Sequence, residues 1–208
     1  MKIVKLNSQY IKLALKYLQA GKAVVYPTDT AYGLGVDATN VKAVKNLFKI
    51  KERKNQPTHI VVADLKMAKQ IAEFNPAAEK LFKKFLPGPL TLILELRIKN
   101  RESWKLLSAG TGTIGIRMPD HKVALDLVRK LGKPITTPSA NPAGGPAPYS
   151  AIDSFRQFSG KKYQPDLYLD VGKLRRQKPS TMVKLIGDQV EILRSGPITS
   201  KQIQQALK

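Results

Sequence analysis

The stretch from residue 23 to residue 37, AVVYPTDTAYGLGVD, constrains the fold most strongly. It begins with the apolar run AVVY, whose β-branched and aromatic members favour a buried strand. Pro27 cannot donate to a strand ladder, and the Thr-Asp-Thr triplet at residues 28–30 follows it with two hydroxyls and a carboxylate. Gly33 and Gly35 then permit positive φ angles or a close approach to a bound molecule. The order predicts a ligand-binding loop at the carboxyl end of a strand, with a plain strand-to-helix turn as the alternative.

Two glycine patterns imitate the dinucleotide-binding fingerprint, but neither fits it. In the first, PTDTAY separates Gly33 and Gly35 from the strand, and the region around Asn55, where an acidic residue belongs, is basic. The second, at residues 110–115, leads into the strand-like TIGIRM rather than into a helix. The chain also has no G-x-S-x-G elbow and no G-x-x-x-x-G-K-[ST] loop. These patterns give no support to a nicotinamide cofactor or to a serine-hydrolase mechanism.

The charge balance is strongly basic. Thirty-six Lys and Arg residues against fifteen Asp and Glu give a formal net charge of +21. Such a field favours polyanions, which are nucleic acid, nucleotides or an anionic membrane surface. The cations are spread along the chain, and each cluster taken singly is usually a solvated face. Cysteine is absent, which excludes disulfides, thiolate metal sites and cysteine nucleophiles.

The length and the apolar content set the size of the core. With 208 residues, 42% of them hydrophobic, we expect one domain over residues 1–208. No run of 18 apolar residues occurs, and the amino-terminal segment MKIVKLNSQYIKLAL resembles a strand and an amphipathic helix rather than a signal peptide. We therefore expect a soluble, cytoplasmic protein without membrane attachment.

Strand and helix patterns alternate along the chain. We expect strands at residues 3–6, 23–26, 59–63, 90–96, 113–118, 135–137, 167–171, 181–186 and 190–193. Helices are expected from a cap at residue 7 or 8 to 20, from 39 or 40 to 53, at 64–73, from 76 to the Pro-Gly-Pro of residues 87–89, and at 122–131 and 150–158, with a last one capped by residue 199 or 200. A basic, mobile linker containing Trp104 joins the strands at 90–96 and 113–118, and the turn-rich residues 138–148 exclude regular structure. Gly187 and Asp188 form a hairpin turn, so we predict an α/β fold whose open twisted sheet has mixed direction and flanking helices.

Four segments near the ends of these elements carry polar side chains. They are residues 28–30, Lys51 with Arg53, Thr113 with Arg117, and Ser139 with Asn141. In open α/β sheets, ligands bind in the crevice outside the carboxyl ends of the strands, so these segments can share a site. Together they offer hydroxyls, amides and fixed cations, but no nucleophile with a base beside it. This set suits anionic oxygens and a hydroxylated amino acid.

Six motifs follow one another along the chain. They are PTDTAYGLG, the K-x-R of Lys51 and Arg53, LPGPLTLIL, TIGIRMPDH, the S-x-N of Ser139 and Asn141 within TPSANPAGG, and VEILRSG. In this order and spacing they resemble the YrdC-type threonylcarbamoyl-AMP synthase family, over roughly residues 6–197. The chain is similar to the short, single-domain members. The resemblance implies a YrdC-like fold with a concave basic surface.

The resemblance also implies a reaction. It is that of an L-threonylcarbamoyladenylate synthase, a nucleotidyltransferase that joins L-threonine, bicarbonate or CO2, and ATP with release of pyrophosphate. Mg2+ is expected with the ATP phosphates, and the product leads to N6-threonylcarbamoyladenosine in tRNA through a downstream threonylcarbamoyl transferase. Because threonine supplies the nucleophile, the protein mainly aligns groups and stabilises charge.

The resemblance assigns roles to particular residues. Catalysis falls to Lys51 and Arg53, which would face the phosphates. Threonine binding falls to Thr30, Arg117, Thr137 and Ser180, and ATP binding to Arg53, Thr113, Ser139, Asn141 and Arg194, with no metal held by the protein. Lys51 and Arg53 do not share a helical face, so the pair is expected at a helix end or in a loop. Arg117 would clamp the threonine carboxylate by two hydrogen bonds, with a structural ion pair as the alternative.

The segment after K-x-R departs from the family pattern. The family reads R-P-x-x-x-P-L-I-V-H there, whereas residues 54–61, KNQPTHIV, are one residue shorter. A threonine-contacting histidine of the family then aligns with Val61, which cannot replace it. His59 either takes this role or is a partly buried strand histidine, and both interpretations remain open. His121 is expected to enter a helix, capped by Asp120, rather than to act as an acid or base.

Two other functions fit part of the sequence. The high positive charge favours a non-catalytic double-stranded RNA-binding protein of the same fold, whose affinity would fall steeply with salt. Carbamoyl transfer like that of the HypF domain of the same superfamily is the third hypothesis. The zinc-finger and acylphosphatase segments expected in HypF are absent from this sequence.

Overall fold

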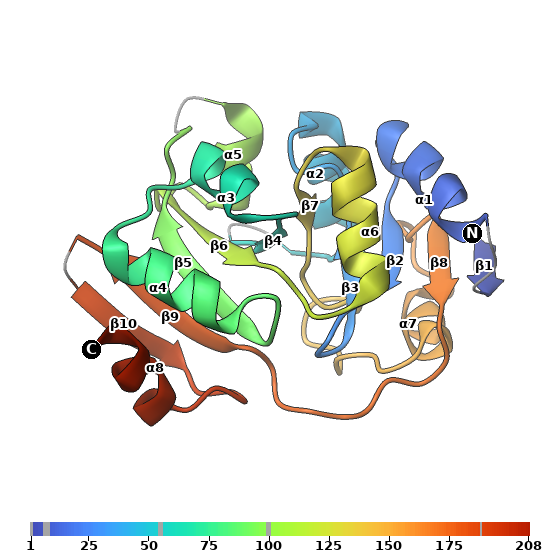
Figure 1. Cartoon of the computed structure of the whole chain (residues 1–208). Helices are drawn as coiled ribbons and strands as arrows, with labels where there is room; N and C mark the ends of the chain where they lie inside the picture. Colours follow the sequence, from blue (N-terminus) through green and yellow to red (C-terminus); the bar gives the residue numbers. More distant parts are fainter. Residues whose placement is uncertain (1, 6–8, 54–55, 99–100, 188) are drawn as a thin grey trace.

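The computed structural model describes residues 2–5, 9–53, 56–98, 101–187 and 189–208, and its strands form two sheets (Figure 1). The four-stranded sheet has the order β1 (Lys2–Lys5), β8 (Leu167–Asp170), β2 (Val24–Pro27) and β3 (Tyr32–Gly35). The six-stranded sheet has the order β10 (Gln189–Arg194), β9 (Thr181–Ile186), β5 (Leu90–Glu95), β6 (Thr113–Arg117), β4 (Ile60–Val61) and β7 (Ile135–Thr136).

Both sheets have mixed direction. In the smaller sheet β8 runs parallel to β1 and β2, and β3 is antiparallel to β2. In the larger sheet β5 is parallel to β9 but antiparallel to β6, and β9 and β10 form the expected antiparallel hairpin. The predicted mixed α/β class is confirmed, although the strands divide between two sheets rather than one. Asp188 of the predicted turn lies outside the described residues.

Eight helices of the described residues pack around the sheets. They are α1 (Tyr10–Gln19), α2 (Val41–Ile50), α3 (Leu65–Ile71), α4 (Pro76–Phe85), α5 (Glu102–Leu107), α6 (Lys122–Leu131), α7 (Ala151–Phe158) and α8 (Ser200–Leu207). Asp64, Ser150 and Thr199 cap three of them as predicted, because each side chain accepts a first-turn amide. The residues predicted to cap α1, 7 and 8, lie outside the described residues. None of the described helices is long and apolar enough to cross a membrane.

Two local predictions were wrong. The linker predicted to be mobile contains α5, because Trp104 is 1% exposed and packs with Leu107 in the larger hydrophobic core. The predicted loop after β2 is largely strand β3, which pairs Val25 with Leu34. Gly35 is needed there for space rather than for a positive φ, since a Cβ would come within 2.8 Å of the Tyr26 ring. The ligand loop is therefore confined to residues 28–31.

The two sheets meet along β3 and β7. Val36 accepts a backbone hydrogen bond from Thr136 (3.0 Å), and the Leu34 amide donates to Pro138 (2.8 Å). The Thr136 hydroxyl spans the same seam, accepting from the Val36 amide and donating to the Leu34 carbonyl. Because β7 is antiparallel to β4, the residue after β7 lies beside the residue before β4, and the Thr137 amide donates to the His59 carbonyl (2.9 Å). The turn after β2 and Arg117 at the end of β6 line the same cavity as these two residues.

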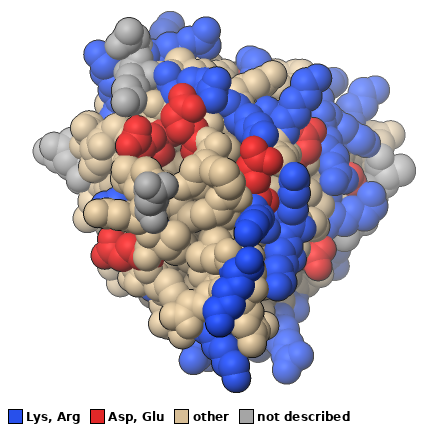
Figure 2. All heavy atoms as spheres, turned by 60° about the vertical axis from the view of Figure 1, so that its left-hand side comes forward, with Lys and Arg blue, Asp and Glu red and all other residues tan. Residues whose placement is uncertain are grey.

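The excess of positive charge is a property of the surface. Figure 2 shows a face on which Lys and Arg far outnumber Asp and Glu and form a band from top to bottom. Within the described residues only eight ion pairs form, and in seven of them at least one partner is a fifth or more exposed. Most cations on this surface are thus solvated rather than paired.

Candidate functional site

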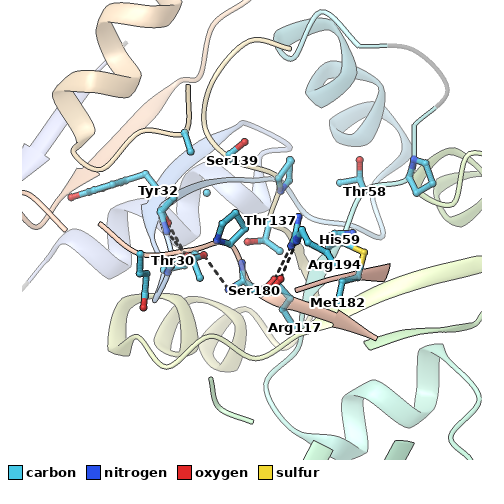
Figure 3. A pocket seen from close by; sticks show the side chains of 18 of the residues that line it. Thr30, Tyr32, Thr58, His59, Arg117, Thr137, Ser139, Ser180, Met182 and Arg194 are labelled. Carbon is cyan, nitrogen blue, oxygen red and sulfur yellow. Dashed lines mark hydrogen bonds between the residues drawn. The ribbon is translucent and has the colours of Figure 1, made fainter. Parts of the chain in front are cut away.

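A cavity of about 410 Å³ opens where the two sheets meet (Figure 3). Its wall combines segments that lie far apart in the sequence. Seven residues predicted for the site line it: Thr30, Arg53, Arg117, Thr137, Ser139, Ser180 and Arg194. The expectation that these segments share one site is met for these seven side chains.

The turn after β2 forms the first part of this wall. The Thr28 hydroxyl accepts from the amides of Thr30 (3.2 Å) and Ala31 (3.3 Å) and donates to the Ala31 carbonyl (2.7 Å). The Thr28 and Thr30 hydroxyls are also hydrogen-bonded at 3.2 Å. This compact turn fixes Thr30 at the cavity and Asp29 behind it.

Arg117 ends β6 and meets that turn. Its Nη2 donates to Asp29 Oδ1 at 2.7 Å and to Thr30 Oγ1 at 3.2 Å. The Arg117 side chain is 7% exposed and that of Asp29 is 9% exposed, so the ion pair is buried. The structural ion pair considered as an alternative thus exists, yet the same guanidinium lines the cavity.

The K-x-R motif lies at a helix end, as predicted. Lys51 caps α2, and Glu52 takes a left-handed conformation (φ 51°). The Glu52 amide bonds to Lys49 and the Arg53 amide to Phe48, both at 3.1 Å, which is the hydrogen-bond pattern of a Schellman motif. The turn sends the Lys51 and Arg53 side chains to different places.

Lys51 does not line the cavity, which corrects its expected place against the phosphates. It is 4% exposed, and its ammonium donates to the carbonyls of Ser139 (2.6 Å) and Asn141. Burial, with a smaller contribution from the charge of Arg53, lowers the Lys51 pKa to about 8. Lys51 therefore holds the S-x-N loop in place from behind the cavity wall.

Arg53 and Arg194 line the cavity without an acidic partner among the described residues. Arg53 Nη2 donates to the Pro57 carbonyl at 2.6 Å. Arg194 donates through Nε and Nη2 to the carbonyl and the hydroxyl of Ser180, both at 3.0 Å. Burial lowers the pKa of both guanidiniums, and in Arg194 the charge of Arg117 adds to this effect. Within the described ranges, the two cations consequently lack a counter-charge.

His59 lines the cavity, whereas Val61 is buried in β4 and does not. The His59 ring lies against Gly115, where a Cβ would come within 2.3 Å of it. Burial lowers the His59 pKa to about 3, and the charges of Arg117, Arg194 and Arg53 act in the same direction. The imidazole is therefore neutral at neutral pH. Its place agrees with the interpretation that His59 contacts a ligand.

Two predicted residues besides Lys51 lie outside the cavity wall. Asn141 is buried, and its amide nitrogen donates to the carbonyls of Pro142 (2.7 Å) and Gly145 (2.8 Å). Thr113 begins β6 and bonds to Thr111 at 3.0 Å, with Arg117 at the other end of the strand. A five-residue strand separates its ends by roughly 13 Å. The structure thus does not bring Thr113 to the predicted ATP site.

Buried polar atoms without a partner gather around the cavity. Seven such atoms occur in the described part of the chain, and three belong to its wall: Arg53 Nε, Arg117 Nε and Thr137 Oγ1. Asp29 Oδ2 and Asn141 Oδ1, directly behind the wall, are two more. Because buried polar groups are nearly always hydrogen-bonded, this concentration indicates a place for a polar ligand.

Sequence reasoning missed several cavity residues, among them Tyr32, Tyr149 and Gln177. Tyr149 directly follows the turn-rich segment 138–148. An aromatic residue alone at the end of such a segment is the sequence signal that could have indicated it. His121, by contrast, caps α6 through Nδ1, which accepts from the Val123 amide at 3.2 Å. Its expected place at a helix entry is confirmed, although it replaces Asp120 as the cap.

Known proteins are similar to this chain in sequence and in architecture. A family model described as Telomere recombination (Sua5_yciO_yrdC) matches residues 16–196. The chain belongs to this family. Threonylcarbamoyl-AMP synthase of Pyrococcus abyssi is 35% identical over 199 residues, 95% of this chain and 57% of that protein. A putative threonylcarbamoyl-AMP synthase of Methanocaldococcus jannaschii is 36% identical over 98% of this chain and 95% of its own length.

Solved structures of the Sua5/YciO/YrdC family have the same fold. P. abyssi Sua5 complexed with L-threonine matches with a TM-score of 0.90 and 33% identity, covering all of this chain and 61% of that one. This chain therefore spans little more than half the length of the P. abyssi protein. Full-length HypF matches with a TM-score of 0.76 and 20% identity, which shows a shared fold only.

Proposed function

We propose that this protein is an L-threonylcarbamoyladenylate synthase. The observation that carries the proposal is the convergence of three guanidinium groups, Arg53, Arg117 and Arg194, on one cavity that hydroxyl groups also line. Such a wall suits a ligand with a carboxylate and several phosphates. The names of two relatives and the L-threonine bound to P. abyssi Sua5 support the same reaction.

The two substrates would occupy different sides of the cavity. Arg117 with Thr30, Thr137 and Ser180 offers a cation and hydroxyls to the carboxylate and hydroxyl of L-threonine. Arg53, Arg194 and Ser139, which line the same cavity, offer donors to the phosphates of ATP. Neutral His59 lies near all three guanidiniums and adds a donor or acceptor that carries no charge.

In the reaction, the threonine amine attacks CO2, forms a C–N bond and gives up a proton to become a carbamate. A carbamate oxygen then attacks the α-phosphorus, and the bond from that phosphorus to the bridging oxygen breaks with release of pyrophosphate. The substrate supplies its own nucleophile. Arg53 and Arg194 would stabilise the charge that develops on the phosphate oxygens, and Arg117 would hold the amino acid in line.

Mg2+ would arrive with ATP as part of the substrate. The charged side chains that line the cavity are cations, and the Asp29 carboxylate behind the wall is paired with Arg117. In the described ranges no group of three His, Cys, Asp or Glu residues is placed to hold a metal ion. We therefore assign the ion to the phosphates and derive no step from it.

The test is threonine-dependent release of pyrophosphate. The protein is incubated with ATP, Mg2+, bicarbonate and labelled L-threonine, and we expect pyrophosphate and labelled adenylate in equal amounts. Omitting threonine or bicarbonate should stop the release. A pure, folded preparation that releases pyrophosphate at the same rate without threonine, or releases none, refutes the proposal.

The positive surface supports a second candidate, which is contact with tRNA or double-stranded RNA in the cytoplasm. The net charge of +21 and the band of Lys and Arg in Figure 2 are the observations that favour it. RNA binding without any affinity for threonine or ATP would favour a purely RNA-binding protein. Affinity should fall steeply between 50 and 200 mM salt, as is typical of phosphate contacts.

A further inference from the structure

One wall of the cavity is a segment without helix or strand. Residues 171–180 connect β8 of the smaller sheet to β9 of the larger one, and Figure 1 shows this segment (orange) passing along the lower edge between the two sheets. We call residues 175–179 the strap. Gln177 and Pro179 of the strap line the cavity, and all five strap residues are exposed.

Both ends of the strap are anchored. Before it, the Tyr32 hydroxyl donates to the Gly172 carbonyl (2.8 Å) and accepts from the Val171 amide (3.1 Å), and Leu174 packs against the larger core. After it, Ser180 is fixed by the two hydrogen bonds from Arg194. The strap is thus a short span between two fixed points.

The middle of the strap is held by one side chain. The Tyr149 hydroxyl donates to the Gln177 carbonyl at 3.3 Å, and the Arg176 guanidinium lies over the Tyr149 ring, 5.5 Å from its centre. Within the described residues these are the polar contacts that the strap makes. A segment with so few contacts opens at low cost compared with the sheets beside it.

The fastening groups belong to the cavity itself. Tyr32, Tyr149 and Arg194 all line it, so a ligand that contacts them also acts on the strap. Gln177 in addition borders a neighbouring groove of about 670 Å³, which Asp29 and Gly88 also line. Displacement of the strap would therefore open the cavity sideways into this groove.

We propose that the strap is a movable wall through which ligands enter and leave the cavity, and that Tyr149 is the positioning residue that keeps it closed. The proposal rests on the proposed function in one respect, the identity of the ligands. An enclosed cavity excludes water from a reactive adenylate, and an opening wall is needed to release it. Tyr149 acts on this step through the strap.

Limited digestion with trypsin tests, without any ligand, whether Tyr149 keeps the strap closed. The strap offers cleavage after Arg175 and Arg176, and fragment masses identify these cuts. Tyr149→Phe removes the hydroxyl and keeps the ring beneath Arg176. We expect cleavage there to become about fivefold faster, the effect of losing one neutral hydrogen bond. Tyr163→Phe is the matched control, because that exposed ring also lies beneath lysine ammonium groups and is not part of the cavity wall. It should cleave at the wild-type rate.

The second arm adds ligands and kinetics. L-threonine with a non-hydrolysable ATP analogue should slow cleavage of the wild-type strap, and Tyr149→Phe should raise the nucleotide dissociation rate about fivefold with an unchanged melting temperature. Equal cleavage of Tyr149→Phe and wild type overturns the role of Tyr149 in keeping the strap closed, even if pyrophosphate release is normal. Ligands that bind but leave cleavage unchanged overturn the movable wall. Failure of the wild type to bind either ligand refutes the proposed function. The ligand-free comparison of cleavage rates still decides whether Tyr149 keeps the strap closed.

Discussion

Two groups of residues in the cavity wall handle positive charge in opposite ways. Arg117 is paired with Asp29 inside the protein, and both side chains are less than a tenth exposed. Among the described residues, Arg53 and Arg194 bond only to carbonyl and hydroxyl oxygens. The first group is organised before a ligand arrives, whereas the second carries charge that a ligand must compensate. The group that is neutral by itself suits a small zwitterion, and the cationic group suits a polyphosphate.

The comparison predicts the largest loss of stability for Arg117→Ala. This change leaves the Asp29 carboxylate buried without a partner, which typically costs about 3–5 kcal/mol in free energy of unfolding. Urea denaturation measures it. Arg117→Met combined with Asp29→Asn removes both charges and should recover a large part of the loss. A single variant as stable as the wild type would show that the pair is not a buried unit.

Arg53→Ala should act on the reaction rather than on the fold. Because no carboxylate in the described part of the chain pairs with Arg53, its free energy of unfolding should stay near that of the wild type. Transition-state stabilisation should fall by roughly 3 kcal/mol, about two powers of ten in kcat/KM for pyrophosphate release. Arg97→Ala, which removes an exposed arginine paired with Glu73, is the control. A near wild-type rate for Arg53→Ala contradicts its role at the phosphates.

Lys51 should make both the stability and the activity of the protein depend on pH. Its pKa is lowered from 10.5 to about 8, so between these values the unfolded chain binds more protons and stability from this group rises with pH. In the same window the folded protein loses the ammonium that holds Ser139 and Asn141, so we expect activity to fall above pH 8. Lys51→Met should be about tenfold less active at pH 7 because two charged hydrogen bonds are missing. Its activity should not fall further between pH 8 and 10, and a parallel fall in both proteins argues against Lys51 as the titrating group.

Substitution of His59 should change the free energy of unfolding least at neutral pH and clearly in acid. Its pKa is lowered from 6.5 to about 3, so the unfolded chain binds more protons between these values. Stability from this group is complete above pH 6.5 and decreases as the pH falls toward 3. His59→Asn should therefore lose less stability than the wild type when denaturation is compared at pH 7 and pH 4. Equal losses would show that the imidazole is not held neutral.

Local patterns predicted most of the helices and strands and part of the cavity wall. Apolar periodicity located the majority of the strands and helices. The polar segments near the ends of these elements supplied Thr30, Arg53, Arg117 and Ser139 of the cavity wall, and the family resemblance added Thr137, Ser180 and Arg194. The spacing of Lys51 and Arg53 also predicted that K-x-R lies at a helix end, since residues two apart do not share a helical face.

What the sequence did not show depends on contacts between distant segments. The burial of Lys51 requires two carbonyls from residues 139 and 141, which lie about ninety positions away along the chain. The basic segment around Trp104 forms a helix because the Trp104 side chain packs in the larger hydrophobic core. Asp29 and Tyr149 gain their importance from Arg117 and the strap, and no local pattern indicates those partners. The division of the strands into two sheets likewise follows from long-range pairing.

A crystal structure with L-threonine and a non-hydrolysable ATP analogue bound together tests the central claim most directly. We expect the threonine carboxylate at Arg117, the phosphates at Arg53 and Arg194, and the amine of threonine facing the α-phosphorus across the space that CO2 would occupy. Ligands bound outside this cavity, or phosphates at Arg117 with Arg53 and Arg194 left in solvent, would contradict the account.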